Sequence, residues 1–491
     1  MKKVVVVAFS LLVSFPVFSQ NVLTLEECRS MALGNNKEHK IAEEEVFIAG
    51  YRKKAAFTKY LPDLSIKGAY IRNEKDIALI GEDMYLPIGT LTESGFAFTP
   101  DQINNKWTMV NGQAVPLDAA GQPFNPKTNP EKIQWKQYTT IPKDELTFDT
   151  KNIYVGVLNL TQPVFMGGKI VAYNKIAKLN QELALSKQES NRQNVILSVD
   201  ETYWQIVSLE NKKKAVNGLI ELLNKMDHDV SLMKETGVAT KADELSVQVK
   251  QNEAEMALLK IDNGISLSKM LLAQYCGIPI DREFSLADEN LEEIPLTEID
   301  SVNMEQVYEN RSELKSLDYA TQIYKQKEKV VRADMLPTVA LMANYMGTNP
   351  NSFDGFQNKF GFTWNVGVVV NIPLLHWGEQ IHLLNAAKCE TNIANFKLDD
   401  VQEKVELQVS QCEFKQTEAK RKLSLAQKNL ERAEENLKYA TLGFNEGVVP
   451  ASNLLEAQTA WLTAKSDKIE AEIDAKMSEI YLQKAVGQLG R

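Results

Sequence analysis

Hydrophobic and polar positions alternate most clearly along residues 361–372. One face of this segment carries only apolar side chains, which are Phe362, Trp364, Val366, Val368 and Val370. The opposite face carries glycine, threonine and asparagine, with Val369 as the one apolar exception. Alternation with a period of two is typical of a β-strand that has one apolar and one polar side. Weaker versions of this pattern predict further strands over 63–72, 152–161 and 338–347.

Two very long helices are predicted by stretches that contain almost no helix-breaking residues. The whole segment 379–442 lacks glycine and proline, and 169–235 has a similar pattern. At about 1.5 Å per residue, such a helix spans roughly 100 Å, far more than the helices of ordinary globular domains. A glycine suited to a left-handed cap follows each one, at Gly237 and Gly447. Return helices are then expected over 238–275 and 450–485.

The same order of elements occurs twice, which indicates an internal duplication. A shorter predicted helix ends at Leu-Pro in each copy, at Pro62 and again at Pro337. Later landmarks recur at one constant distance along the chain, which we call the repeat spacing: Pro163 with Pro373, Gly237 with Gly447, and Gly277 with Gly487. The Leu-Pro pair is farther apart than this, so the first copy carries an insertion within 73–150. The structural repeats are therefore expected over 20–278 and 311–487, with a short tail over 488–491.

Residues 1–19 have the pattern of a secretory signal peptide, because two lysines precede an apolar run that ends in a small residue. No later apolar run approaches the length that a membrane-spanning helix needs, so none is expected. The 55 basic and 65 acidic residues give a net charge of -10, which disfavours nucleic acid as a partner.

No motif indicates an enzyme, a metal site or a bound cofactor. Gly167-Gly168-Lys169 resembles the end of a phosphate-binding loop, but it lacks the upstream glycine and the following serine or threonine. The four histidines have no metal-binding spacing. The four cysteines are scattered without CxxC spacing, and we expect them to be small buried apolar residues, although an exported protein can form disulfides.

The number of strands constrains any arrangement in a membrane. Small membrane barrels begin at eight strands, so four strands cannot close, and an open sheet would leave unpaired backbone groups in lipid. If these strands cross a membrane, several chains must share one barrel, and three chains would supply 12 strands. The predicted fold class is mostly α with a small β part.

Several motifs resemble those of TolC-type outer-membrane efflux proteins. Near the N-terminus these are Leu-Thr-Leu-Glu-Glu over 23–27, Ala-Leu-Gly-Asn-Asn over 32–36 and the break at Leu61-Pro62. Near the second turn they are Gly-Phe-Asn-Glu-Gly-Val-Val over 443–449 and Leu-Leu-Glu-Ala-Gln over 454–458. The resemblance covers residues 23–487, which is nearly the whole of the expected mature chain.

The resemblance implies a homotrimer with a 12-stranded β-barrel in the outer membrane of a Gram-negative bacterium. A long α-helical barrel would continue into the periplasm, with an equatorial connector over 279–310. Such proteins are exit ducts of tripartite efflux pumps or type I secretion systems. Their partners are outer-membrane lipid, a periplasmic adaptor protein and an inner-membrane transporter of the RND or ABC type, and they have no enzymatic activity.

The resemblance also implies a periplasmic gate at the helical tips, next to the tip turns at Gly237 and Gly447. The family's acidic ring positions correspond here to Asn453 and Glu456. Three Glu456 side chains around a narrow axis would attract cations. The alternative interpretation of Glu456 is a solvated carboxylate on a helix face.

The family's polar latch between the tips corresponds to Phe444 and Val449, opposite Asp243 and Ala242. Phe444 has no hydroxyl and Val449 has no charge, so the latch cannot form in its usual way. We hypothesise that apolar packing of Phe444, Val448 and Val449 replaces it.

Two other functions remain open from the sequence, a passive trimeric porin and a helical-rod surface or structural protein. The duplicated strand pairs argue against the rod. The insertion 73–150 joins two strands and is expected at the extracellular end, either as an ordered cap or plug, or as a flexible loop. No residue pattern identifies the transported substrate.

Overall fold

The structure is a computed structural model that describes residues 22–88, 90–92, 95–97, 102–291, 294–296 and 302–490. The expected signal peptide lies outside these residues. Within the described residues, none of the helices is both long enough and apolar enough to span a membrane. The chain divides into two compact units. The first comprises Met1–Lys59, Gly167–Met335 and Pro373–Arg491, and the second comprises Tyr60–Met166 and Leu336–Ile372.

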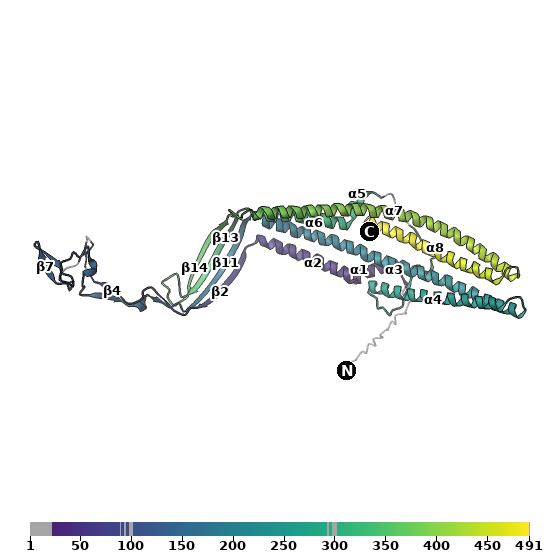
Figure 1. The fold of residues 1–491 in the computed structure, drawn as a ribbon, viewed down its shortest axis with the longest axis horizontal. Coiled ribbons are helices and arrows are strands. Elements are labelled where there is room, and N and C mark those ends of the chain that lie inside the picture. Colours follow the sequence, from purple (N-terminus) through teal and green to yellow (C-terminus); the bar gives the residue numbers. More distant parts are fainter. Residues whose placement is uncertain are drawn as a thin grey trace, which may run out of the picture. The chain divides into compact units, whose positions relative to one another are not determined.

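Helices make up almost all of the first unit (Figure 1). They are α1 (Leu25–Asn35), α2 (Lys37–Phe57), α3 (Lys169–Glu235), α4 (Lys241–Cys276), α5 (Met304–Asn310), α6 (Ser312–Ala333), α7 (Glu379–Asn445) and α8 (Ala451–Ala485). A short parallel pair of strands, β1 (Val22–Leu23) and β12 (Ser285–Leu286), also belongs to this unit. The expectation of a mostly helical chain with a small β part is confirmed.

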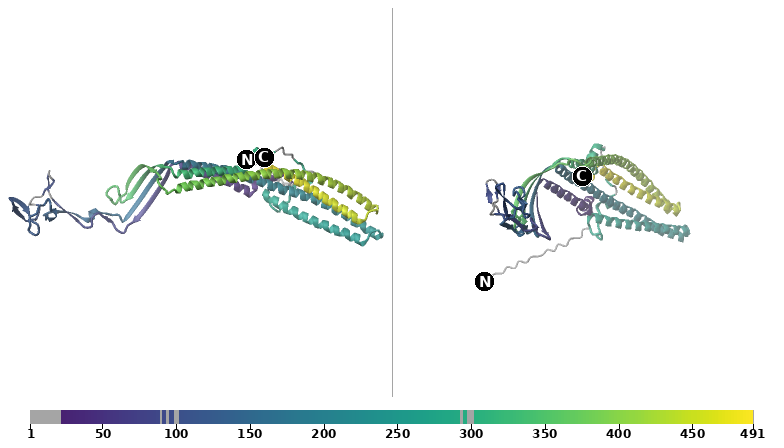
Figure 2. Two further views of the ribbon diagram at one scale, coloured as in Figure 1. Left: turned by 45° about the horizontal axis from the view of Figure 1, so that its top comes forward. Right: turned by 60° about the vertical axis from the view of Figure 1, so that its left-hand side comes forward.

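The long helices α3 and α7 organise the packing of the first unit. Helix α3 contacts α2, α4, α6 and α8, whereas α7 contacts α6 and α8. In both views of Figure 2, α4 runs beside α3 and α8 runs beside α7. Both long helices begin after a glycine in the left-handed region, Gly168 and Gly378, each with φ of 85°. These glycines make the sharp change of direction that an L-residue with a Cβ resists.

Helices α4 and α7 begin or end at other residues than the sequence predicts. Helix α4 begins at Lys241 rather than at 238, because Thr240 accepts a hydrogen bond from the Asp243 backbone N–H and caps the helix there. Helix α7 continues beyond the expected end at 442, as far as Asn445.

The cysteines depart from the expectation that all four are buried. Cys28 and Cys276 are buried, but Cys389 is exposed on α7 and Cys412 is only partly buried. The expectation is therefore wrong for Cys389. Its position on the helix points it away from the packed side of α7, which the helical pattern alone did not distinguish.

The second unit contains a four-stranded antiparallel sheet in the order β14-β13-β11-β2. The strands are β2 (Asp63–Arg72), β11 (Asn152–Met166), β13 (Thr338–Asn349) and β14 (Gly361–Asn371). Strand β11 extends past the expected end at 161, because a bulge between Pro163 and Phe165 lets pairing with β13 continue past a residue that has no N–H. The apolar face of β14 is exposed in a single chain, with Trp364 73 % exposed.

The insertion in the second unit is built from short antiparallel strand pairs, two of which carry labels in Figure 1. Its strand pairs are β3 (Ile77–Ala78) with β10 (Thr147–Phe148), β4 (Met84–Pro87) with β9 (Tyr138–Ile141), β5 (Thr90–Thr92) with β6 (Gly95–Ala97), and β7 (Trp107–Val110) with β8 (Gln113–Pro116). Ile103, Phe124 and Ile133 form a small core beneath Trp107 and Trp135. The part over 102–150 therefore contains paired strands and a small core of its own.

Candidate functional site

The two helical tips have the same backbone turn. In the first, the Gly237 N–H donates to the Lys234 carbonyl (3.0 Å) and the Val238 N–H donates to the Met233 carbonyl (2.9 Å). In the second, the same two bonds recur at the repeat spacing with the same lengths, ending at the Phe444 and Gly443 carbonyls. Gly237 and Gly447 have φ of 79° and 71°, so both occupy the left-handed position that closes a helix.

The two tips differ at a pair of positions inside the turn, where one tip has a large residue followed by a small one and the other has the reverse. In the first tip, Met233 faces the small residue Ala239. In the second tip, Gly443 takes the place of the methionine and Val449 takes the place of the alanine. A Cβ on Gly443 would lie 2.6 Å from Val449 Cγ2, so this glycine is required by close approach. In each turn the larger of the two side chains therefore occupies the opposite position.

The first tip is held by charge. Glu244 Oε2 accepts hydrogen bonds from Lys234 Nζ (2.7 Å) and from Lys241 Nζ (2.6 Å), so one carboxylate bridges the end of α3 and the start of α4. The hydrogen bond from Lys234, followed by that from Lys241, lowers the pKa of Glu244 below its ordinary value. The negative charge also lies in the first turn of α4, where the helix dipole favours it.

Asp243 belongs to a capping box rather than to a latch between the tips. Its Oδ2 accepts hydrogen bonds from the Thr240 hydroxyl (2.6 Å) and backbone N–H (2.8 Å), and these bonds lower its pKa. The Thr240 hydroxyl accepts from the Asp243 N–H in return (3.2 Å). The carboxylate is therefore engaged within its own tip.

The second tip has apolar residues where the first has its charge bridge. At the repeat spacing, Lys234, Lys241 and Glu244 correspond to Phe444, Ala451 and Leu454. These three are all buried, and Phe444 is only 4 % exposed. Pro450 occupies the N-cap of α8, where no side chain caps the helix.

Apolar packing joins the two tips. Phe444, Ala451, Leu454 and Leu455 form one buried cluster with residues of the first tip, which are Leu219, Leu223, Met226, Val230, Val247 and Ala254. Between residues 226–250 and 440–462, all of which the structure describes, no hydrogen bond or ion pair is present. The tips are therefore held together by burial alone.

The residues that the sequence analysis assigned to the gate do not form one cluster: some are buried at the tips and others are exposed to solvent. Phe444 is buried between the tips as hypothesised, and Val449 is partly buried against its own turn. Val448 is 80 % exposed, so its proposed part in the apolar packing is wrong: it lies at the outermost point of the turn. Asn453 and Glu456 are exposed on one face of α8.

Two features of the tips escaped the sequence reasoning. The first is the lysine–glutamate bridge. A comparison of the copies at the repeat spacing shows three charged residues in place of three apolar ones, but the contacts among them come only from the structure. The second is Gln458, which is 3 % exposed and whose Oε1 has no hydrogen-bond partner. It lines a cavity of about 110 Å³ together with Leu219, Leu223 and Leu455.

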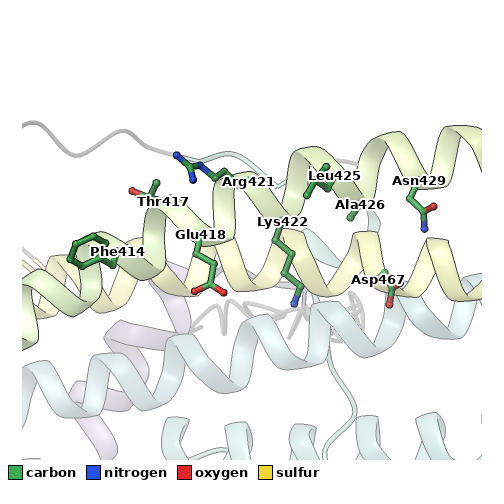
Figure 3. Close-up of a pocket in the computed structure, with 9 residues that line it drawn as sticks. All are labelled: Phe414, Thr417, Glu418, Arg421, Lys422, Leu425, Ala426, Asn429 and Asp467. Atoms are coloured by element: carbon green, nitrogen blue, oxygen red, sulfur yellow. The ribbon is translucent and has the colours of Figure 1, made fainter.

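A larger groove follows the outer side of α7 beside α8 (Figure 3). Its volume is about 820 Å³, and its lining residues are Phe414, Thr417, Glu418, Arg421, Lys422, Leu425, Ala426, Asn429 and Asp467. Figure 3 shows that all but Asp467 come from α7. Phe414 and Leu425 are 78 % and 67 % exposed, so the groove is a largely apolar surface with charged edges.

Among the described residues, no group of three or more histidine, cysteine or acidic side chains is placed to hold a metal ion.

Comparison with known proteins identifies the family. The model of the family described as "Outer membrane efflux protein" matches residues 132–277 and 303–488. A search of curated protein sequences finds no match.

Solved structures with a similar fold include three outer-membrane proteins, of which CmeC and MtrE are described as channels. VceC of Vibrio cholerae has a TM-score of 0.69 and 16 % identity, over 95 % of this chain and 97 % of that one. CmeC of Campylobacter jejuni has a TM-score of 0.70 and 15 % identity, over 94 % and 85 %. MtrE of Neisseria gonorrhoeae, in its open state, has a TM-score of 0.68 and 13 % identity, over 95 % and 89 %. With the family model matching both halves of the described fold, this chain belongs to the outer membrane efflux protein family.

Proposed function

We propose that three copies of this outer-membrane exit duct form one channel, with a shared 12-stranded β-barrel and an α-helical barrel in the periplasm. The observation that carries this proposal is the open four-stranded sheet with an exposed apolar face on β14. Its edge strands β2 and β14 each pair on one side only. In lipid those edges need partners, and a neighbouring copy supplies them without changing the strand order.

The helices offer a matching pair of surfaces for the same neighbour. The exposed stripe of α7 consists of Phe396, Leu407, Phe414 and Leu425, and that of α4 consists of Leu245, Val249, Met256 and Leu259. Leu425 and Leu259 are equally far along the chain from their tip glycines, Gly447 and Gly237. We assign the groove beside Leu425 to helix α4 of the next copy, which would meet it at the same height.

A pair of introduced cysteines tests this assembly. In a background without Cys389 and Cys412, Leu425→Cys combined with Leu259→Cys is expected to cross-link copies into trimers on mild oxidation. The matched control combines Leu425→Cys with Leu245→Cys, which lies about 21 Å of helix closer to the tip. Equal cross-linking of both pairs, or dimers that never reach trimers, would contradict the arrangement.

The helical tips form the proposed periplasmic gate. The tip turns at Gly237 and Gly447 close each hairpin, and burial of Phe444 joins the hairpins without a polar latch. Val449 supports its own turn, and Asp243 acts as a helix cap. Asn453 and Glu456 are exposed side by side on α8, so in a trimer they are available to form rings around the axis.

Export would depend on partners at both membranes that border the periplasm. An adaptor and an inner-membrane transporter of the RND or ABC type would deliver substrates, outer-membrane lipid would cover the apolar strand face, and the insertion 73–150 would face the outside.

Deletion of the gene, followed by a susceptibility panel with complementation, tests export. Increased sensitivity to drugs, detergents, bile acids or metals that the intact gene restores is expected. A passive porin would instead give a reconstituted channel that is open without partners, and no such sensitivity.

A further inference from the structure

Two buried thiols meet between the N-terminal helix and the end of a return helix. Cys28 on α1 and Cys276 at the end of α4 are both 0 % exposed and belong to the same buried cluster. Cys276 Sγ also donates to the Cys28 carbonyl at 3.5 Å. The two residues are 248 positions apart in sequence, so their contact is a product of the fold, which packs α1 against α4.

Polar contacts on both sides hold this pair in place. Next to Cys28, Arg29 donates from Nε and Nη2 to the two carboxylate oxygens of the buried Asp200, at 2.7 and 2.6 Å. Next to Cys276, Asn35 Nδ2 donates to the Cys276 carbonyl at 2.9 Å. Bidentate arginine–carboxylate pairs fix geometry as well as adding stability. The thiols therefore lie between two anchored segments.

The second copy fills the corresponding place without cysteine. Cys276 corresponds to Val486 at the repeat spacing, and Val486 is buried in one cluster with Val307 of α5. Asn35 and Asn310 end α1 and α5, and each lies against the glycine that follows a return helix. When the two helices are aligned at Asn35 and Asn310, α1 extends one turn farther toward its N-terminus than α5 does. Cys28 lies in this additional turn. A valine is thus enough to fill this buried position in the second copy. In the first copy the position holds Cys276, and the additional turn of α1 brings Cys28 next to it.

We propose that Cys28 and Cys276 form a disulfide in the exported protein. Both thiols lose a proton and an electron as the S–S bond forms. The oxidant is a periplasmic thiol–disulfide oxidoreductase, whose own disulfide accepts the two electrons and two protons and becomes a dithiol. The reaction takes place during folding after export, while the pair is still accessible, and the structure holds the reduced form of the same contact.

The chemistry of the pair favours this reaction. Contact with the Cys28 side chain lowers the pKa of Cys276. The thiolate is the nucleophile in thiol–disulfide exchange, so Cys276 is the more reactive sulfur once the two side chains are in contact. Cys389 is exposed on α7 and Cys412 is partly buried, and neither belongs to the buried cluster that holds Cys28 and Cys276, so we expect both to stay free.

The bond would fasten α1 to the equatorial end of α4 and close a loop containing almost the whole first repeat. A cross-link of that length restricts the unfolded chain strongly. The second repeat, with Val486 at the equivalent position, has no such link.

Alkylation of the full-length protein tests the proposal. Protein extracted from outer membranes is denatured with an alkylating agent present, with or without prior reduction, and its intact mass is measured. We expect two alkylated cysteines without reduction and four after it. Tryptic mapping should then show the peptide that ends at Arg29 joined to the peptide over 270–282.

Cysteine variants show which of the four cysteines form the disulfide. Cys389→Ser/Cys412→Ser should show no alkylation before reduction and two sites after it. Cys276→Val, which copies the residue of the second repeat, should fold and should leave Cys28 open to alkylation. Four alkylated cysteines in the unreduced wild-type protein, or a disulfide that joins other cysteines, would overturn the assignment. Neither result would affect the proposed trimer or export.

Discussion

The two helical tips share a backbone and differ in almost everything attached to it. Their turns have the same hydrogen bonds at equivalent positions of the two repeats. The first tip surrounds Glu244 with two lysines, whereas the second places Phe444 and Leu454 at the corresponding positions. Duplication has therefore preserved the turn and exchanged a charge bridge for an apolar contact.

This difference assigns separate roles to the tips. The first is self-contained, since its charges and its capping box are satisfied within one hairpin. The second buries Phe444 against the first, so its stability depends on its neighbour. We infer that movement of the proposed gate begins where α8 separates from the first hairpin, since only apolar contact opposes it there.

The largest effect is expected for Phe444→Ala. Truncating a buried phenylalanine costs about 3–5 kcal/mol, and here it removes the side chain that joins the tips. Hydrogen exchange over 440–462 should accelerate, and the reconstituted channel should conduct more. Lys234→Ala is the matched control at the corresponding position: it removes one hydrogen bond to Glu244 within the first tip and leaves the apolar contact between the tips intact. Unchanged exchange in the phenylalanine variant would refute the role given to this contact.

A smaller effect is expected for Gly443→Ala, because the new Cβ would lie 2.6 Å from Val449 Cγ2. Overpacking of this kind costs about 1–3 kcal/mol. The double variant Gly443→Ala/Val449→Ala approaches the Met233 and Ala239 arrangement of the first tip and should recover most of the loss. Thermal unfolding of the three variants measures the coupling. Purely additive losses would show that the two positions do not share space.

Acidification should loosen the first tip and leave the second unchanged. The pKa of Glu244 lies below its ordinary value of 4.5, so its stabilising contribution is complete above that value. The contribution is lost as the pH falls through the lower folded pKa. Spin labels at Val238 and Val448, both at the exposed ends of the turns, report mobility at each tip. Glu244→Gln should raise mobility at Val238 already at neutral pH, and equal responses at both tips would contradict the comparison.

The smallest effect on stability is expected for Glu456→Ala, since the side chain is exposed and holds no neighbour. Its effect should instead appear in conduction, where loss of a ring of carboxylates weakens block by multivalent cations. Asn453→Ala on the same face is the uncharged control. Single-channel recordings with unchanged block would remove Glu456 from the proposed gate.

Much of the fold could be predicted because its determinants are local. Helix α3 has the bounds that the sequence predicts, since a glycine precedes it and a turn glycine follows it. The strand β2 also begins and ends where expected. The longer β11 could not be predicted, because Pro163 reads as a strand end until the bulge opposite Val339 is seen.

The tip residues were predicted less well, for a physical reason. The sequence predicts that Phe444 cannot form the polar latch and that Asp243 is the polar latch position that remains. Their actual partners, a buried cluster and Thr240, depend on how the helices pack and where α4 begins. The orphaned Gln458 and the bridge at Glu244 are also set by side chains that meet across helices.

The sequence by itself determined the duplication, the long helices, the strand pattern and the family resemblance, because periodicity and turn glycines act over a few neighbouring residues. Only the tertiary structure decided which equivalent positions carry charge bridges or apolar contacts, and that Cys28 meets Cys276. These contacts join segments that are far apart in the chain, and their geometry exists only once the helices have packed.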